Sequence, residues 1–70
     1  MDIKKRVNQI VRKYGTRNPL EIVEKMDMIL VRYPLEGVRG FYHYFQRNHI
    51  IYVDDRLPEH IILFVIAHEL

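Results

Sequence analysis

Seven consecutive apolar residues, Ile61 to Ala67, constrain the fold of this chain more than any other feature of its sequence. Pro58 and Glu59 precede them and suit the first turn of a helix, because proline fits the first helical position and a carboxylate is favourable at the positive end of the helix dipole. A helix that is apolar on every side is normally buried on every side. In a complete domain, we expect the other elements to surround this helix.

The length of the chain allows one small domain with a marginal core, because 70 residues bury a smaller share of their surface than a long chain does. The sequence has no Cys, so a metal would need His and carboxylate ligands. The apolar run is far shorter than the roughly 20 residues of a membrane-spanning helix, and no apolar segment of a signal peptide follows Met1. We expect a cytoplasmic protein with no membrane partner.

Two short helices are predicted before the sheet. Apolar residues recur at helical spacing from residue 3 to residue 14, and Gly15 suits a helix C-terminus, which predicts a helix over about 2–14. Asn18 can cap a second helix that begins at Pro19 and ends near residues 25–27. Its apolar side is expected to carry Leu20, Val23 and either Met26 or Met28.

Three strands are predicted next, over residues 28–33, 41–46 and 49–53, because these segments are rich in β-branched and aromatic residues. With the final helix they give an α+β fold: two N-terminal helices, a three-stranded mostly antiparallel sheet, and a last helix. Both sheet faces are apolar, so helices on both sides are plausible.

Arg47-Asn48 is the expected turn of a hairpin between the second and third strands, since Asn tolerates positive φ. This turn would place Phe45 opposite Ile50 and His43 opposite Tyr52 on one face. On the other face it would pair Tyr44 with Ile51 and Tyr42 with Val53.

His68 and Glu69 follow the apolar run directly and are the residues most able to carry chemistry. A zinc peptidase helix reads H-E-x-x-H: two His one turn apart bind the metal, and the Glu acts on the metal-bound water. The dipeptide alone is a weak signal. A long apolar helix that enters His-Glu-Leu directly after a small sheet strengthens it.

These residues, in this order, resemble the ImmA/IrrE family of zinc-dependent metallopeptidases. The resemblance rests on the two short helices, the strand start Gly40 to His43, the strand Ile50 to Val53 with Asp54, and the helix that ends Ile66 to Leu70. It spans the whole chain but only the N-terminal part of the family's catalytic domain. It implies that His68 is the first zinc ligand and Glu69 the catalytic glutamate, with a second His and a third ligand further along.

The resemblance also implies a function. Family members are bacterial or mobile-element hydrolases associated with cleavage of a transcriptional repressor, often a helix-turn-helix protein. Residues 1–70 then correspond to the N-terminal portion of such a peptidase domain. Because the second His position lies beyond Leu70, we expect the chain as given to be catalytically incomplete and not to bind zinc tightly.

The remaining polar residues have simpler interpretations. His43, His49 and His60 are expected to be surface residues, and the pair Asp54-Asp55 a turn before the last helix. The early basic residues can bind an anionic partner or form the solvated face of the first helix, and no pattern supports a nucleic-acid partner. These residues are Lys4, Lys5, Arg6, Arg12, Lys13 and Arg17.

An alternative function remains open: a non-catalytic interaction or oligomerisation module derived from the same family. If helices that normally cover the last helix are missing, Ile61 to Ala67 would be exposed. An exposed apolar surface favours association. This alternative predicts a homo-oligomer formed through the third helix.

Overall fold

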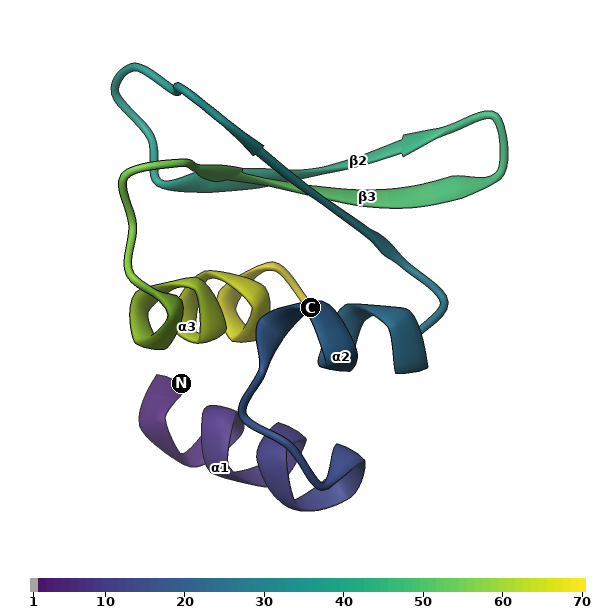
Figure 1. Ribbon diagram of the computed structural model, residues 1–70, viewed down its shortest axis with the longest axis vertical. Coiled ribbons are helices and arrows are strands. Elements are labelled where there is room, and N and C mark those ends of the chain that lie inside the picture. Colours follow the sequence, from purple (N-terminus) through teal and green to yellow (C-terminus); the bar gives the residue numbers. More distant parts are fainter. Residues whose placement is uncertain (1) are drawn as a thin grey trace.

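The computed structural model describes residues 2–70, which form an α+β fold of three helices and one three-stranded sheet. The predicted fold class is therefore confirmed. All three helices lie on the same side of the sheet: α3 lies next to the sheet, and α1 lies on the far side of α3 (Figure 1). The elements are α1 (Ile3–Tyr14), α2 (Pro19–Lys25), β1 (Ile29–Tyr33), β2 (Gly40–Phe45), β3 (Asn48–Asp54) and α3 (Glu59–Glu69).

Local capping explains where α1 and α2 begin and end. The Asp2 side chain accepts a hydrogen bond from the Lys5 backbone N–H at 3.1 Å, and Gly15 ends α1 with a φ of 72°. The Asn18 side chain accepts from the backbone N–H of Leu20 at 3.0 Å, and Pro19 occupies the first turn of α2. The predicted boundaries of both helices are confirmed.

The apolar side of α2 differs from the prediction in two residues, Leu20 and Ile22. Ile22 and Val23 are buried, whereas Leu20 is 49% exposed. Ile22 and Val23 lie on the same side of α2 as the buried Pro19, because side chains three or four positions apart on a helix are neighbours. Leu20 falls on the opposite side and faces solvent.

The sheet is mixed, with strand order β1-β3-β2. β2 and β3 pair antiparallel as a hairpin, and β1 pairs parallel with β3. A parallel pair needs a long connection between its two strands, and the β2 segment supplies it here. One of the two strand pairs is thus parallel, so the prediction of a mostly antiparallel sheet is corrected to a mixed sheet, because strand direction is not encoded in the local sequence pattern.

The hairpin register differs from the prediction. The turn is Gln46-Arg47, with φ of 49° and 68°, and Tyr44 therefore pairs with His49 and His43 with Ile50. The predicted turn one residue later was wrong. The shift moves each partner by two positions, so every side chain keeps the face assigned to it from the sequence.

The core lies between the sheet and the helices, with α3 at its centre. Ile51 and Val53 from β3 and Ile62 and Ile66 from α3 are all fully buried. A second cluster joins α1 and α2 to the far side of α3 through Val7, Ile10, Ile22, Leu63 and Ala67. The expectation that Ile61 to Ala67 would be exposed is corrected, because the chain's own sheet and helices cover most of this run. Formation of a homo-oligomer stays a prediction.

Helices on both faces of the sheet were plausible from the sequence, but only one face is covered (Figure 1). The opposite face, called the outer face below, is partly or largely exposed and carries no Lys, Arg, Asp or Glu side chain in its central part. Its residues are Ile29, Val31, Phe41, His43, Phe45, Ile50 and Tyr52.

None of the helices within residues 2–70 has the length and apolar character needed to cross a membrane.

Candidate metal-binding and catalytic site

His68 and Glu69 lie in the last turn of α3, and both line one groove. The groove has a volume of about 550 Å³ and runs between the end of α3, the start of the edge strand β2 and the first residues of α1. Its other walls are formed by Ile3, Val38, Arg39, Gly40, Phe64 and Val65. The structure therefore brings the two residues predicted from the sequence to a single concave surface at the sheet edge.

Gly40 allows the close approach that forms this groove. A Cβ atom at Gly40 would lie 2.5 Å from the Tyr52 carbonyl oxygen and 2.7 Å from Val65 Cγ1. Real Cβ atoms do not come so close to backbone or side-chain atoms. The first residue of β2, Gly40, thus contacts α3 directly. The contact on α3 is Val65, which lies three positions before His68.

The two side chains differ in exposure in a way that fits separate roles. His68 is exposed and Glu69 is half-buried, and among residues 2–70 neither side chain forms a hydrogen bond or an ion pair. An accessible imidazole nitrogen is a good zinc ligand, and a carboxylate at a groove wall can accept a proton from water. The groove is therefore lined by one imidazole and one carboxylate, and their roles as metal ligand and general base stay predictions.

A complete zinc site needs at least three protein ligands. Among residues 2–70, no three His, Cys, Asp or Glu side chains converge closely enough to hold a metal ion. His60 lies on the same helix as His68, eight residues earlier, which corresponds to about 12 Å along the axis. The donors present thus fit one position of a zinc site, and further ligands would have to come from outside these residues.

The other two His residues lie away from the groove. His43 is on the outer face and stacks on Phe45 with ring centroids 5.8 Å apart. His49 lies on the opposite face, where its Nδ1 shares a hydrogen bond with the Tyr42 hydroxyl and its ring lies 4.9 Å from that of Tyr44. His43, His49 and His60 are all exposed, as expected from the sequence.

Asp54 has a structural partner. Arg56 donates to both of its carboxylate oxygens, with Nη2 at 2.7 Å from Oδ2, and the same Nη2 donates to the Leu35 carbonyl at 2.9 Å. The side-chain hydrogen bond from Arg56 lowers the pKa of Asp54. This pair joins the end of β3 to the loop before β2, in agreement with the interpretation of Asp54-Asp55 as structural residues.

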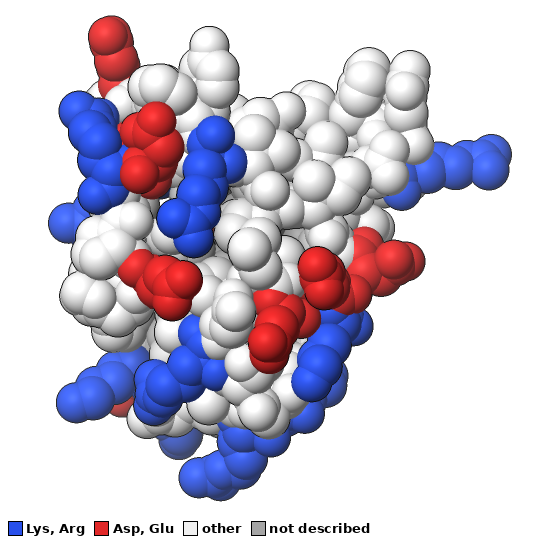
Figure 2. All heavy atoms as spheres, viewed as in Figure 1, with Lys and Arg blue, Asp and Glu red and all other residues white. Residues whose placement is uncertain are grey.

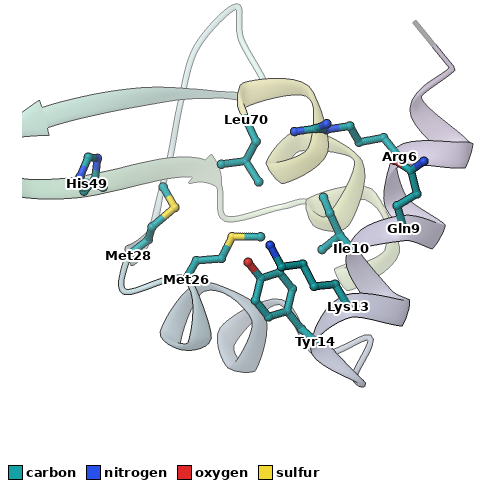
Figure 3. A pocket seen from close by; sticks show the side chains of 9 residues that line it. All are labelled: Arg6, Gln9, Ile10, Lys13, Tyr14, Met26, Met28, His49 and Leu70. Atoms are coloured by element: carbon teal, nitrogen blue, oxygen red, sulfur yellow. The ribbon is translucent and has the colours of Figure 1, made fainter.

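A second pocket, of about 600 Å³, is not predicted by the sequence pattern. It lies between α1, α2 and the start of β3, and Arg6 and Lys13 of α1 project along it (Figure 3). The one feature of the sequence that indicates this pocket is the spacing of Arg6, Ile10 and Lys13. This spacing places two cations and one apolar residue on one side of a helix. The pocket shares no lining residue with the groove of His68 and Glu69.

Comparisons with known proteins find a phage protein of similar sequence. No family model matches the chain, and no solved structure matches it. A curated protein of Bacillus phage phi105, described as "Uncharacterized immunity region protein 2", is 33% identical to it over 69 residues. The alignment covers 97% of this chain and 44% of that relative, so the chain spans less than half of the relative's length.

Proposed function

We propose that this chain provides the first zinc ligand, His68, and the catalytic glutamate, Glu69, of a metallopeptidase domain of the ImmA/IrrE type. The observation that carries the proposal is the placement of both side chains in one groove beside the edge strand β2. An edge strand has unpaired backbone N–H and C=O groups, which can hold an extended peptide next to the groove. The groove therefore suits a polypeptide substrate.

Each residue has a distinct task in this proposal. His68 would hold zinc through a ring nitrogen, and zinc, when bound, supplies a Lewis acid that makes water a nucleophile near neutral pH. Glu69 accepts a proton on its carboxylate and returns it to the leaving amine. A second His and a third ligand, which the family resemblance implies, would complete the metal site from outside residues 2–70.

The relative supports the proposed setting of the substrate. A protein of similar sequence is described as belonging to a phage immunity region, which fits a mobile-element setting. The resemblance to the ImmA/IrrE family implies a helix-turn-helix repressor, and we propose such a repressor in the cytoplasm as the substrate. The expectation that residues 1–70 alone do not bind zinc tightly stays a prediction.

The test of this function is cleavage of the repressor encoded beside the gene by the natural polypeptide that carries residues 1–70. Replacement Glu69→Gln should lower the cleavage rate by about 10²–10⁴-fold, because the proton acceptor is lost. Glu59→Gln is the matched control, since it makes the same change at the other end of α3. Equal rates for Glu69→Gln and the unaltered protein would contradict the proposal.

Self-association through the outer face is a second candidate function. Figure 2 shows the region of the β2–β3 hairpin largely free of charged side chains, with blue only at its far end, whereas charges cover other parts of the surface. Phe41 and Phe45 on this face are 41% and 54% exposed, and Phe41 stacks on Tyr52 at 4.8 Å. An uncharged apolar face is complementary to itself, and two sheets can pack about 10 Å apart. The occupant that fits it is a second copy of this chain.

This candidate is tested by sedimentation of the chain over a wide concentration range. Phe45→Glu should shift the protein to monomer, because a carboxylate would be buried without a partner in the sandwich. Leu20→Glu is the matched control, since Leu20 is exposed to a similar extent, 49%, but lies on α2. The same monomer–dimer equilibrium in both variants would exclude the outer face as the interface.

A further inference from the structure

The pocket between α1, α2 and the start of β3 is separate from the groove proposed for catalysis. Apolar side chains line it, including Ile10 of α1 and, in the segment between α2 and β1, Met26 and Met28. Arg6 and Lys13 supply two positive charges, and none of the side chains that line it within residues 2–70 is acidic. An apolar lining with convergent polar groups is the usual composition of a ligand site.

The two cations have no acidic partner. The one ion pair within residues 2–70 joins Asp54 to Arg56, so neither Arg6 nor Lys13 has a carboxylate within ion-pair distance. The Nε atom of Arg6 is buried and has no hydrogen-bond partner. Buried donors almost always have one. Figure 3 shows the Arg6 side chain reaching from α1 toward the end of α3, and Lys13 and Tyr14 directed toward Met26. The pocket therefore presents positive charge that the chain does not neutralise.

The spacing of these charges specifies the ligand further. Arg6 and Lys13 are seven residues apart on α1, which corresponds to about 10 Å along the helix axis. Ile10 lies between them on the same side and belongs to the buried core. Side chains at positions i and i+7 of another helix are also about 10 Å apart and lie on one side, with positions i+3 and i+4 between them.

We propose that this pocket binds an amphipathic helix of a partner protein that carries two acidic residues seven positions apart and large apolar residues between them. The acidic residues pair with Arg6 and Lys13, and the apolar residues contact Ile10, Met26 and Met28. Docking of an amphipathic helix into an apolar groove is a common mode of peptide recognition. Met side chains adapt well to such ligands because they are flexible and polarizable. A fatty acid fits less well, because its single carboxylate would leave one cation unpaired.

The test measures the affinity of the purified chain for an acetylated, amidated helical peptide with glutamates at positions i and i+7 and leucines at i+3 and i+4. Arg6→Gln and Lys13→Gln should each weaken binding about three- to ten-fold. Lys4→Gln and Arg12→Gln are matched controls, since they remove the same charge from α1 outside the pocket. Raising the ionic strength from about 0.05 M to about 0.3 M should also weaken binding, because charge pairs are screened.

A second measurement places the peptide without altering the cations. Methyl resonances of Met26 and Met28 should shift when the peptide binds the unaltered chain, and Arg6→Lys should retain most of the affinity. Three results would each overturn the proposal: no binding of the glutamate peptide, equal binding of a peptide with glutamine in both positions, or equal losses in the pocket variants and the controls. Tighter binding of dodecanoate than of the peptide would identify a lipid carboxylate as the ligand and likewise overturn it.

Discussion

Gly40 determines how closely α3 can approach the sheet at the candidate site. The space for a Cβ atom there is already taken by the Tyr52 carbonyl and by Val65. Backbone atoms cannot move aside as the end of a flexible side chain can. The groove of His68 and Glu69 therefore depends on a residue that has no side chain, because a larger residue at position 40 would push β2 and α3 apart.

Replacement Gly40→Ala should destabilise the fold by about 1–3 kcal/mol, the usual cost of adding a methyl group to a filled space. Chemical denaturation measures this loss. Gly37→Ala is a useful comparison: no atom lies within 4 Å of its Cβ position, so its cost would come from its φ of 81° alone. Unchanged stability of Gly40→Ala would show that the close contact with Val65 is absent.

A second effect of single residues is that the Asp54–Arg56 pair makes the stability of the fold depend on pH. The hydrogen bond from Arg56 lowers the pKa of Asp54 in the folded state. The unfolded chain therefore takes up the proton first as the pH falls, and the unfolded state gains stability relative to the folded one. The contribution of the pair is fully present above the ordinary aspartate pKa of about 3.9 and disappears as the pH falls through the lower pKa of the folded state.

Thermal unfolding of the unaltered chain and of Arg56→Gln checks this dependence. The unaltered chain should melt at the higher temperature near neutral pH, and the difference should shrink toward zero in strong acid. Arg17→Gln removes the same charge from an exposed site and should show no such convergence. If the difference in melting temperature between Arg56→Gln and the unaltered chain stayed constant with pH, the pair with Asp54 would not be the source of the pH dependence.

At the scale of elements, the sequence correctly predicts the ends of helices α1 and α2, because these depend on residues that are adjacent in the sequence. Asn18, Pro19 and Gly15 mark helix ends through their own side chains and backbone preferences, and these ends are correct. The hairpin turn is different. Gln46 and Arg47 adopt positive φ although neither residue favours it, so strand pairing elsewhere in the sheet imposes the turn. The parallel pairing of β1 with β3 likewise depends on residues that are distant in sequence.

The hairpin turn can therefore be improved. Replacing Gln46-Arg47 with Asn-Gly should stabilise the chain by about 0.5–1 kcal/mol, because these residues suit positive φ at both turn positions. Denaturant titration measures the gain. Arg47→Ala is the control, since it removes the side chain but keeps the unfavourable backbone preference. Loss of stability in the Asn-Gly variant would mean that the turn lies elsewhere.

At the scale of the whole molecule, the sequence predicts the fold class and the groove residues, but not what covers each surface. Ile62 and Ile66 were expected to be exposed if covering helices were missing, yet α2 and the sheet bury them. On the other side of α3, α1 covers Leu63 and Ala67. Burial of α3 from two sides depends on how three helices pack together, which no local pattern encodes. The same packing leaves the outer face open and creates the pocket of Arg6 and Lys13, so both features were found only in the structure.

The zinc content of the natural polypeptide that carries residues 1–70 tests the proposal that His68 is a zinc ligand. We predict one zinc ion per chain, lost in His68→Ala but retained in His60→Ala, which removes an exposed His from the same helix. Glu69→Gln should also retain the metal, because Glu69 acts on water and not as a ligand. A protein without zinc, or one whose zinc content is the same after His68→Ala, would show that His68 is not a zinc ligand.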